Sequence, residues 1–101
     1  MTITLKVEQF VQANPAQIFY AFTHAISLTE WLCDYATIAP RPGGRMYLWW
    51  HGDFYSAGEY IYLDKDKAVI FQWHGRGDPA PSEVEVMLRE QDSGTLVSLI
   101  Q

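Results

Sequence analysis

The side chains able to bind metal or act as acids and bases are few in this sequence, and they lie far apart. The histidines are His24, His51 and His74, and the single cysteine is Cys33. None shows the close spacing of a zinc site, such as His at i and i+4 or Cys-x-x-Cys. His24 is expected to close a helix, where the helix dipole favours it, and the other two histidines to end strands beside glycine. We therefore expect no metal ion and no cofactor.

Patterns typical of nucleophilic catalysis or phosphate binding are also missing. There is no Gly-x-Ser-x-Gly turn, and Gly43-Gly44 lacks the Lys and Ser/Thr that follow a phosphate-binding glycine loop. Cys33 stands beside Leu32 and near Trp31, which favours a small buried apolar residue over a reactive thiolate. The sequence favours a binding protein over an enzyme.

Aromatic residues make up 15% of the chain and are its most informative feature. In "MYLWWH" strand alternation separates two faces, with Met46, Leu48 and Trp50 on one and Tyr47, Trp49 and His51 on the other. Val69, Phe71 and Trp73 likewise share a face. These side chains could pack in a hydrophobic core or line an apolar pocket, and both interpretations stay open. Which way Tyr47 and Trp49 face is also open, and exposure to water would indicate a protein–protein surface.

Composition narrows the class of protein. A chain of 101 residues is most simply one domain, 1–101, able to bury its own core. The formal net charge is −5, and the dispersed Lys and Arg residues form no basic stripe, so nucleic acid and membrane surfaces are poor partners. The alternating N-terminus and the single cysteine predict a cytoplasmic protein with no signal peptide and no membrane span.

The stretch "FQWHGRGDPAP" contains Arg76-Gly77-Asp78, the tripeptide that adhesion proteins present to integrins. Its glycine and proline content is typical of a surface loop between two strands. We interpret the tripeptide as coincidence, since an acidic chain without a signal peptide has no route to an integrin.

The elements that must position these residues begin with a strand, because Ile3, Leu5 and Val7 alternate with polar residues and predict one buried face. The alternation slips near Phe10, as at a strand end or bulge. Asn14-Pro15 predicts the start of a helix that ends near His24. A second short helix is predicted from Ser27, with Glu30 completing a capping box.

From Tyr35 onward the pattern is β. The loop Pro40 to Gly44 leads into a strand, and turns at residues 52–53, 64–67 and 92–94 separate further strands. The order is strand, two short helices, and five or six antiparallel strands in a meander. We expect an α+β domain.

This arrangement resembles the SRPBCC (START-like, helix-grip) superfamily, and within it the bacterial proteins similar to the activator of the ninety-kilodalton heat-shock chaperone ATPase. The segments that carry the likeness are "ANPAQIFYAFT", "LTEWLCD", "RPGGRMYLW", "AGEYIYLDKDKAVIFQW" and "GTLVSLIQ". Each segment alone is an unspecific motif. Together the segments span nearly the whole chain, and their order and spacing carry the likeness.

The resemblance implies a curved antiparallel sheet that grips helices around a hydrophobic cavity. Val84 should then face inward with the sheet residues that would bind an apolar or aromatic small molecule, and Trp31 should be a lid contact. The implied ligand-binding set is Trp31, Met46, Leu48, Trp50, Phe71, Trp73, Val86 and Leu88.

The resemblance also implies a long C-terminal helix, which is absent before the chain ends at Gln101. An uncovered concave sheet would expose a large apolar patch, so we expect that the natural chain continues or that a homodimer, domain swap or partner covers it. The alternative functions are a co-chaperone that docks on a heat-shock chaperone and a cyclase or dehydratase. For an enzyme, His51, His74 and Glu59 would be the acid–base candidates inside the cavity.

Overall fold

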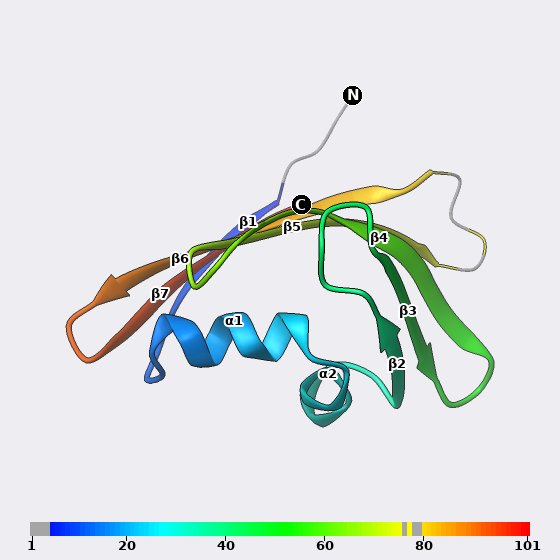
Figure 1. The fold of residues 1–101 in the computed structure, drawn as a ribbon, viewed down its shortest axis with the longest axis horizontal. Coiled ribbons are helices and arrows are strands. Elements are labelled where there is room, and N and C mark those ends of the chain that lie inside the picture. Colours follow the sequence, from blue (N-terminus) through cyan, green and yellow to red (C-terminus); the bar gives the residue numbers. More distant parts are fainter. Residues whose placement is uncertain (1–4, 76, 78–79) are drawn as a thin grey trace.

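The fold is a curved antiparallel sheet with helices against one face, as the computed structural model shows (Figure 1). The structure describes residues 5–75, 77 and 80–101. Within them the elements are β1 (Lys6–Val11), α1 (Pro15–Thr23), α2 (Ala25–Trp31), β2 (Tyr35–Ile38), β3 (Arg45–Trp50), β4 (Phe54–Asp64), β5 (Ala68–Gly75), β6 (Ser82–Gln91) and β7 (Gly94–Ile100). The predicted α+β class is confirmed.

The strand order across the sheet is β1-β7-β6-β5-β4-β3-β2, with antiparallel neighbours throughout. The two helices carry the chain from β1 at one edge to β2 at the other, beneath the concave face (Figure 1). The chain then meanders back until β7 pairs with β1. This is the helix-grip arrangement. Neither helix in the described part of the chain is long and apolar enough to span a bilayer.

The start of α1 follows its sequence signals. The Asn14 side chain accepts a hydrogen bond from the Gln17 backbone N–H at 2.9 Å, and the Gln17 side chain accepts one from the Asn14 N–H at 2.9 Å. Pro15 occupies the first helical position, where a missing N–H costs nothing. The predicted N-cap is confirmed, and His24 caps the helix end as predicted.

The start of α2 differs from the prediction. The helix begins at Ala25, directly after His24, which is also its N-cap and makes no side-chain cap hydrogen bond. The chain bends sharply at this one extended residue (Figure 1), and the Leu28 N–H makes the first hydrogen bond of α2 to the His24 carbonyl oxygen at 3.0 Å. Ser27 therefore lies inside the first turn, and the predicted capping box with Glu30 is wrong.

The first strand keeps the predicted alternation but not the predicted burial. Ile3 lies outside the described residues, while Leu5 and Val7 are 61% and 57% exposed. The reason is that β1 is an edge strand, whereas α1 packs beneath β5 and β6. Of the two alternatives near Phe10, the strand end is confirmed, since β1 ends at Val11. Its pairing with β7 has no bulge, and the sheet's register shift falls between Tyr60 and Tyr62 on β4.

The core lies between the concave face and the helices. Leu28 and Ile18 from the helices meet a layer of sheet side chains that alternation turns inward. The buried members of that layer are Met46, Leu48, Tyr60, Val69, Phe71, Val84, Val86 and Leu88. The predicted inward face of the sheet is confirmed.

Glycines shape the loop before β3. Gly43 has a φ of 79°, as its loop predicts, and a Cβ on Gly44 would lie 1.8 Å from the Ala39 carbonyl oxygen, so these positions need glycine. In the loop after β5, Arg76 and Asp78 lie outside the described residues. The interpretation of the adhesion-like tripeptide stays a prediction.

Three side chains of the sheet, the buried Tyr60 and Thr95 and the half-buried Trp50, hold the helical layer in place. The Tyr60 hydroxyl donates to the Phe22 carbonyl oxygen at 2.8 Å, and the Trp50 indole N–H donates to the Leu32 carbonyl oxygen at 2.7 Å. The Thr95 hydroxyl donates to the Ala13 carbonyl oxygen at 2.7 Å. The carbonyl groups of Phe22 and Leu32 lie at helix C-termini, where they have no partner within the helix, so the sheet satisfies groups that burial would otherwise leave unbonded.

Tyr60 is the largest fully buried side chain of the described residues. Its burial raises the pKa of the phenol well above the usual value, because the charged phenolate would lose its hydration. The folded state therefore holds this proton more tightly than the unfolded state does. The resulting stability is complete below the pKa of an unfolded tyrosine, about 10, and is lost as the pH rises above it.

The change Tyr60→Phe should lower the free energy of unfolding by about 1–3 kcal/mol, since the Phe22 carbonyl loses its donor. It should also remove part of the loss of stability of the natural protein above about pH 10. Urea unfolding at neutral and alkaline pH measures both effects. The control Tyr62→Phe alters a half-exposed ring, and equal effects of the two changes would contradict the assignment.

Candidate functional site

An apolar hollow opens on the concave face between α1 and the β1–β7 edge of the sheet. We call it the concave hollow, and its volume is about 540 Å³, within the range of small-molecule pockets. Its lining residues come from β1, β7 and both helices: Val7, Gln9, Val11, Ala13, Gln17, Ile18, Ala21, Phe22, Trp31, Val97 and Leu99. None of these residues carries a charge, so the hollow suits a neutral, apolar occupant.

Trp31 forms the wall of the concave hollow at the end of α2. Its indole N–H donates to the Ala21 carbonyl oxygen at 3.0 Å, and its ring meets Phe22 edge-on with ring centroids 5.1 Å apart. The side chain remains 50% exposed. Trp31 is therefore fixed against α1 while one ring surface faces the opening.

The polar groups of the concave hollow are two amides. The Gln17 side-chain oxygen already accepts a hydrogen bond from the Asn14 N–H in the cap of α1. Part of the hydrogen-bonding capacity of this amide is therefore occupied. Gln9 on β1 lies opposite Val97 of β7. It is the group best placed to orient a ligand through a hydrogen bond, as a few polar groups do in mostly apolar pockets.

Of the eight sequence-predicted ligand residues, four are packed core residues. Met46, Leu48, Phe71 and Val86 are at most 4% exposed and belong to the cluster beneath the helices. They do not line the concave hollow, because the helices fill the space above them. Leu88 is also buried, at 8% exposed, and borders a separate groove beside Lys67 and Arg89.

The remaining three predicted residues border open space. Trp31 lines the concave hollow, whereas Trp50 and Trp73 line a second hollow of about 400 Å³ near Ser56 and Gln101. The Trp73 ring contacts the Phe71 ring edge-on, with ring centroids 5.3 Å apart. The Trp50 indole N–H donates its hydrogen bond to the Leu32 carbonyl oxygen. The structure thus divides the predicted aromatic set between two places on the concave side.

The apolar residues of β1, α1 and β7 were missed as site residues. The alternation of Val7 with polar neighbours predicts a strand with one apolar face. This local pattern does not predict that β7 pairs with β1. That pairing brings Val97 and Leu99 to the same hollow.

The acid–base candidates lie elsewhere, so the expectation that they face the cavity is wrong. Glu59 lies on the convex face and accepts a hydrogen bond from the Gln72 amide at 2.8 Å. His74 is next to inward-facing Trp73 and therefore points outward. His51 is exposed beyond β3, 3.8 Å from Asp34. Among the described residues no group of His, Cys, Asp and Glu is arranged to hold a metal ion.

Cys33 is a buried, free cysteine whose thiol donates to the Leu28 carbonyl oxygen at 3.7 Å. Burial, and secondarily the negative charge of Asp34, raises the pKa of the Cys33 thiol. The thiolate is therefore disfavoured at neutral pH. The prediction of a small apolar residue is confirmed.

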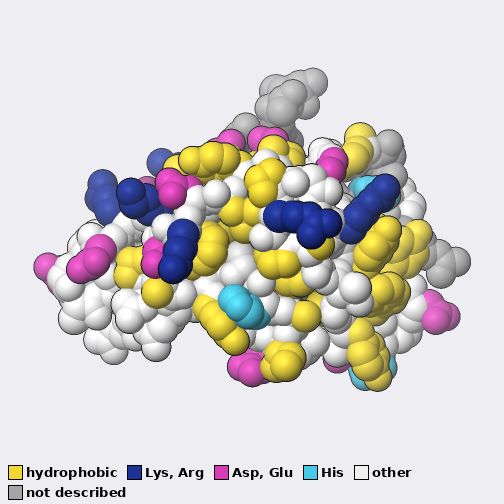
Figure 2. Space-filling view, viewed as in Figure 1, with side chains coloured by type: hydrophobic (Ala, Val, Ile, Leu, Met, Phe, Trp, Pro, Cys, Tyr) yellow, Lys and Arg dark blue, Asp and Glu magenta, His cyan; other side chains and the backbone are white. Residues whose placement is uncertain are grey.

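The convex face carries a row of exposed rings over β2, β3 and β4, which we call the convex aromatic row: Tyr35, Tyr47, Trp49 and Tyr55. Trp49 lies directly between Tyr35 and Tyr55 across the strands, and it stacks on Tyr47 with centroids 5.9 Å apart. These side chains are 36–61% exposed. Hydrophobic side chains also gather over this side of the molecule in Figure 2.

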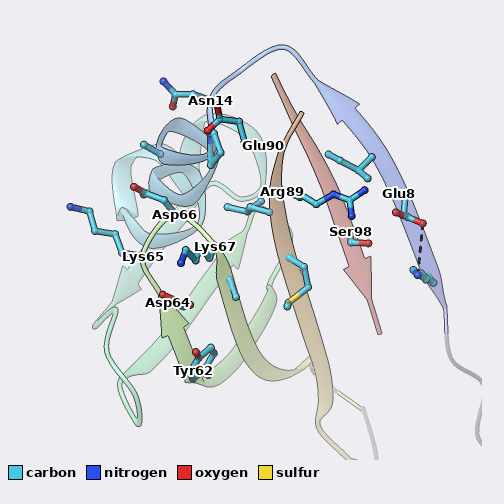
Figure 3. A pocket seen from close by; sticks show the side chains of 17 residues that line it. Glu8, Asn14, Tyr62, Asp64, Lys65, Asp66, Lys67, Arg89, Glu90 and Ser98 are labelled. Carbon is cyan, nitrogen blue, oxygen red and sulfur yellow. Dashed lines mark ion pairs between the residues drawn. The ribbon is translucent and has the colours of Figure 1, made fainter. Parts of the chain in front are cut away.

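A broader groove of about 1070 Å³ lies at the opposite side of the sheet, between β1, β6, β7 and the β4–β5 turn (Figure 3). Its labelled side chains include Glu8, Arg89 and Lys67 with Asp64 and Glu90. Cationic and anionic groups alternate there, so the groove favours neither an anionic nor a cationic ligand.

Comparison of the sequence with protein-family models gives a match over most of the chain. The model of the family described as activator of Hsp90 ATPase homolog 1-like protein matches residues 12–101. That range includes both helices, β2 to β7 and most of the concave hollow. No curated protein sequence matches the chain.

Several solved structures share the fold. CalU16 of Micromonospora echinospora is 25% identical with a TM-score of 0.80, and the match covers 96% of this chain but 58% of that one. The Aha1 dimer of Colwellia psychrerythraea is 17% identical, with a TM-score of 0.86 and coverage of 99% and 75%. An Hsp90 activator of Plasmodium falciparum is 23% identical, with a TM-score of 0.83 and coverage of 98% and 71%.

Proposed function

Since this chain belongs to the family of activator of Hsp90 ATPase homolog 1-like proteins, we propose that it uses the fold of that family to bind a hydrophobic small molecule without chemical turnover. The site is the concave hollow. The observation that carries the proposal is the hollow's uncharged lining of aliphatic and aromatic side chains. Burying apolar ligand surface there would contribute about 25 cal/mol per Å².

The chemistry of the lining defines the ligand class. Val97, Leu99 and Phe22 offer apolar contacts, and Trp31 offers an aromatic surface at the opening. Gln9 offers one amide. The ligand is therefore a neutral, mostly apolar molecule with few hydrogen-bonding groups, and a charged ligand would lose hydration without gaining a partner.

The same lining supports a non-enzymatic role. General acid–base catalysis requires a titratable side chain within hydrogen-bonding reach of the reacting group. The residues of the concave hollow include none, and Glu59, His51 and His74 lie outside it. These positions support binding over a cyclase or dehydratase reaction.

Titration with the neutral fluorophore N-phenyl-1-naphthylamine tests the binding site. Bound probe should show enhanced emission and energy transfer from Trp31. Val97→Glu should weaken binding by about 10-fold or more, because it places a charge in the apolar wall. Ala21→Leu, which fills the hollow without adding charge, should also weaken it.

Met87→Glu is the matched control, since Met87 is 44% exposed and lies on the convex face. It should leave probe binding unchanged. If the natural protein binds no probe, or if the control and the hollow variants bind it equally, the concave hollow is not the site.

The convex aromatic row favours a second candidate function, docking on a heat-shock chaperone of the Hsp90 type. Exposed aromatic rings are enriched at protein–protein interfaces and often supply most of the binding energy. Tyr47 and Trp49 stack on each other outside the core, so folding of the domain does not require them to be aromatic. A partner could bury both rings at once.

Tyr47→Ala with Trp49→Ala should weaken binding to a purified Hsp90-type chaperone by about 10-fold or more and remove any stimulation of its ATPase. Surface immobilisation and an ATPase assay measure these effects. Tyr62→Ala, a similarly exposed ring outside the row, is the control. Absence of binding by the natural protein at micromolar concentration would reject this candidate.

A further inference from the structure

The strand β1 forms the longer open edge of the sheet. At the other edge β2 has four residues and packs beside α2, whereas β1 has six residues, of which all but Val11 are exposed. Leu5 and Val7 expose apolar side chains there. An exposed strand edge is a template for pairing with another strand.

The hydrogen-bond pattern fixes which backbone groups face this open edge. Leu5 and Gln101 exchange hydrogen bonds, with the Leu5 N–H 2.8 Å from the Gln101 oxygen and the Gln101 N–H 2.9 Å from the Leu5 oxygen. In an antiparallel pair, such hydrogen-bonded positions alternate with positions whose backbone groups point away. Lys6, Glu8 and Phe10 therefore direct their N–H and C=O groups toward the open edge.

The side chains of these outward-bonding residues lie on the convex face. Lys6 and Glu8 form an ion pair at 3.8 Å within the strand, shown by the dashed line in Figure 3. Val7, between them, points to the concave side and lines the concave hollow. The open edge thus presents a cation and an anion on one face and an apolar side chain on the other.

We propose that β1 pairs in antiparallel fashion with β1 of a second copy of this chain, around a two-fold axis at Val7. In this register Lys6 lies opposite Glu8 of the partner subunit, and Glu8 lies opposite the partner's Lys6. Both are hydrogen-bonded positions, so each pair exchanges backbone hydrogen bonds as well as charge. Val7 meets Val7 of the partner subunit at the closer, non-bonded position.

Charge selects this register over its neighbours. Moving the axis to Glu8 would place Glu8 opposite its own copy, and moving it to Lys6 would do the same for Lys6, which sets like charges against each other. A register with its axis between two residues would place residues whose backbone groups face the open edge opposite residues whose backbone groups face β7. No ladder of hydrogen bonds could form in that register. The axis at Val7 lets both copies satisfy charge and hydrogen bonding together.

The pairing joins two sheets into one and brings two concave hollows next to each other. Val7 belongs to the lining of the hollow, so Val7 of the partner subunit would extend the apolar wall across the axis. Pairing would also remove Leu5 and Val7 from water. The proposal depends on the edge and its charges, and it holds whether or not the hollow binds a small molecule.

Sedimentation velocity of four proteins tests the interface: the natural chain, Lys6→Glu, Glu8→Lys and the double exchange. Each single change replaces both attractive pairs with repulsive ones and should weaken dimerisation by about 10-fold or more. The double exchange should restore it. A mixture of the two single variants should form a heterodimer although neither variant dimerises alone, because one presents carboxylates where the other presents ammonium groups.

Lys65→Glu, which changes the same net charge in the exposed β4–β5 turn, is the control and should dimerise like the natural chain. The heterodimer result also shows that both single variants fold. A natural chain that stays monomeric at about 0.5 mM, where even weak association is detectable, would overturn the proposal. So would a dimer that Lys6→Glu leaves unchanged.

Discussion

The hydrogen bond from the Tyr60 hydroxyl to the Phe22 carbonyl oxygen is the contact on which the arrangement of the concave side depends. A helix laid under a sheet buries carbonyl groups that its own turns cannot satisfy. Tyr60 from β4 and Trp50 from β3 supply the missing donors at the ends of the two helices. Because these donors are fixed on the sheet, the helices have one satisfied position, and the concave hollow is the space which that position leaves beside β1 and β7.

The two faces of the sheet carry different side chains because strand side chains alternate. Most side chains of the concave face pack against α1 and α2, and open apolar space remains only near its rim. The convex face is free of helices and carries the aromatic row at one side and mixed charges at the other. A small-molecule site and protein-binding surfaces can therefore coexist in a short chain without competing for the same residues.

Much of the fold could be predicted from local signals. Asn14, Pro15 and the alternation of β3, β5 and β6 determine their elements directly, and the inward face followed from alternation. The start of α2 could not be predicted, since its N-cap His24 makes no side-chain cap hydrogen bond and so gives no local signal. The outward placement of His74 could be predicted, because a residue after inward-facing Trp73 must point outward; His74 was a cavity candidate only for the enzyme alternative.

The candidate site was predicted less well, for a physical reason. Alternation tells which side chains turn inward, but only the position of α1 decides which of these are covered. Leu48 and Val86 are covered and became core, whereas Val97 and Leu99 remain at the hollow.

The most direct test of the central claim is methyl NMR of the protein with a bound neutral apolar ligand. We predict nuclear Overhauser contacts from the ligand to the methyl groups of Val11, Val97 and Leu99. Contacts confined to the convex face, or none to these methyl groups, would contradict a ligand site in the concave hollow.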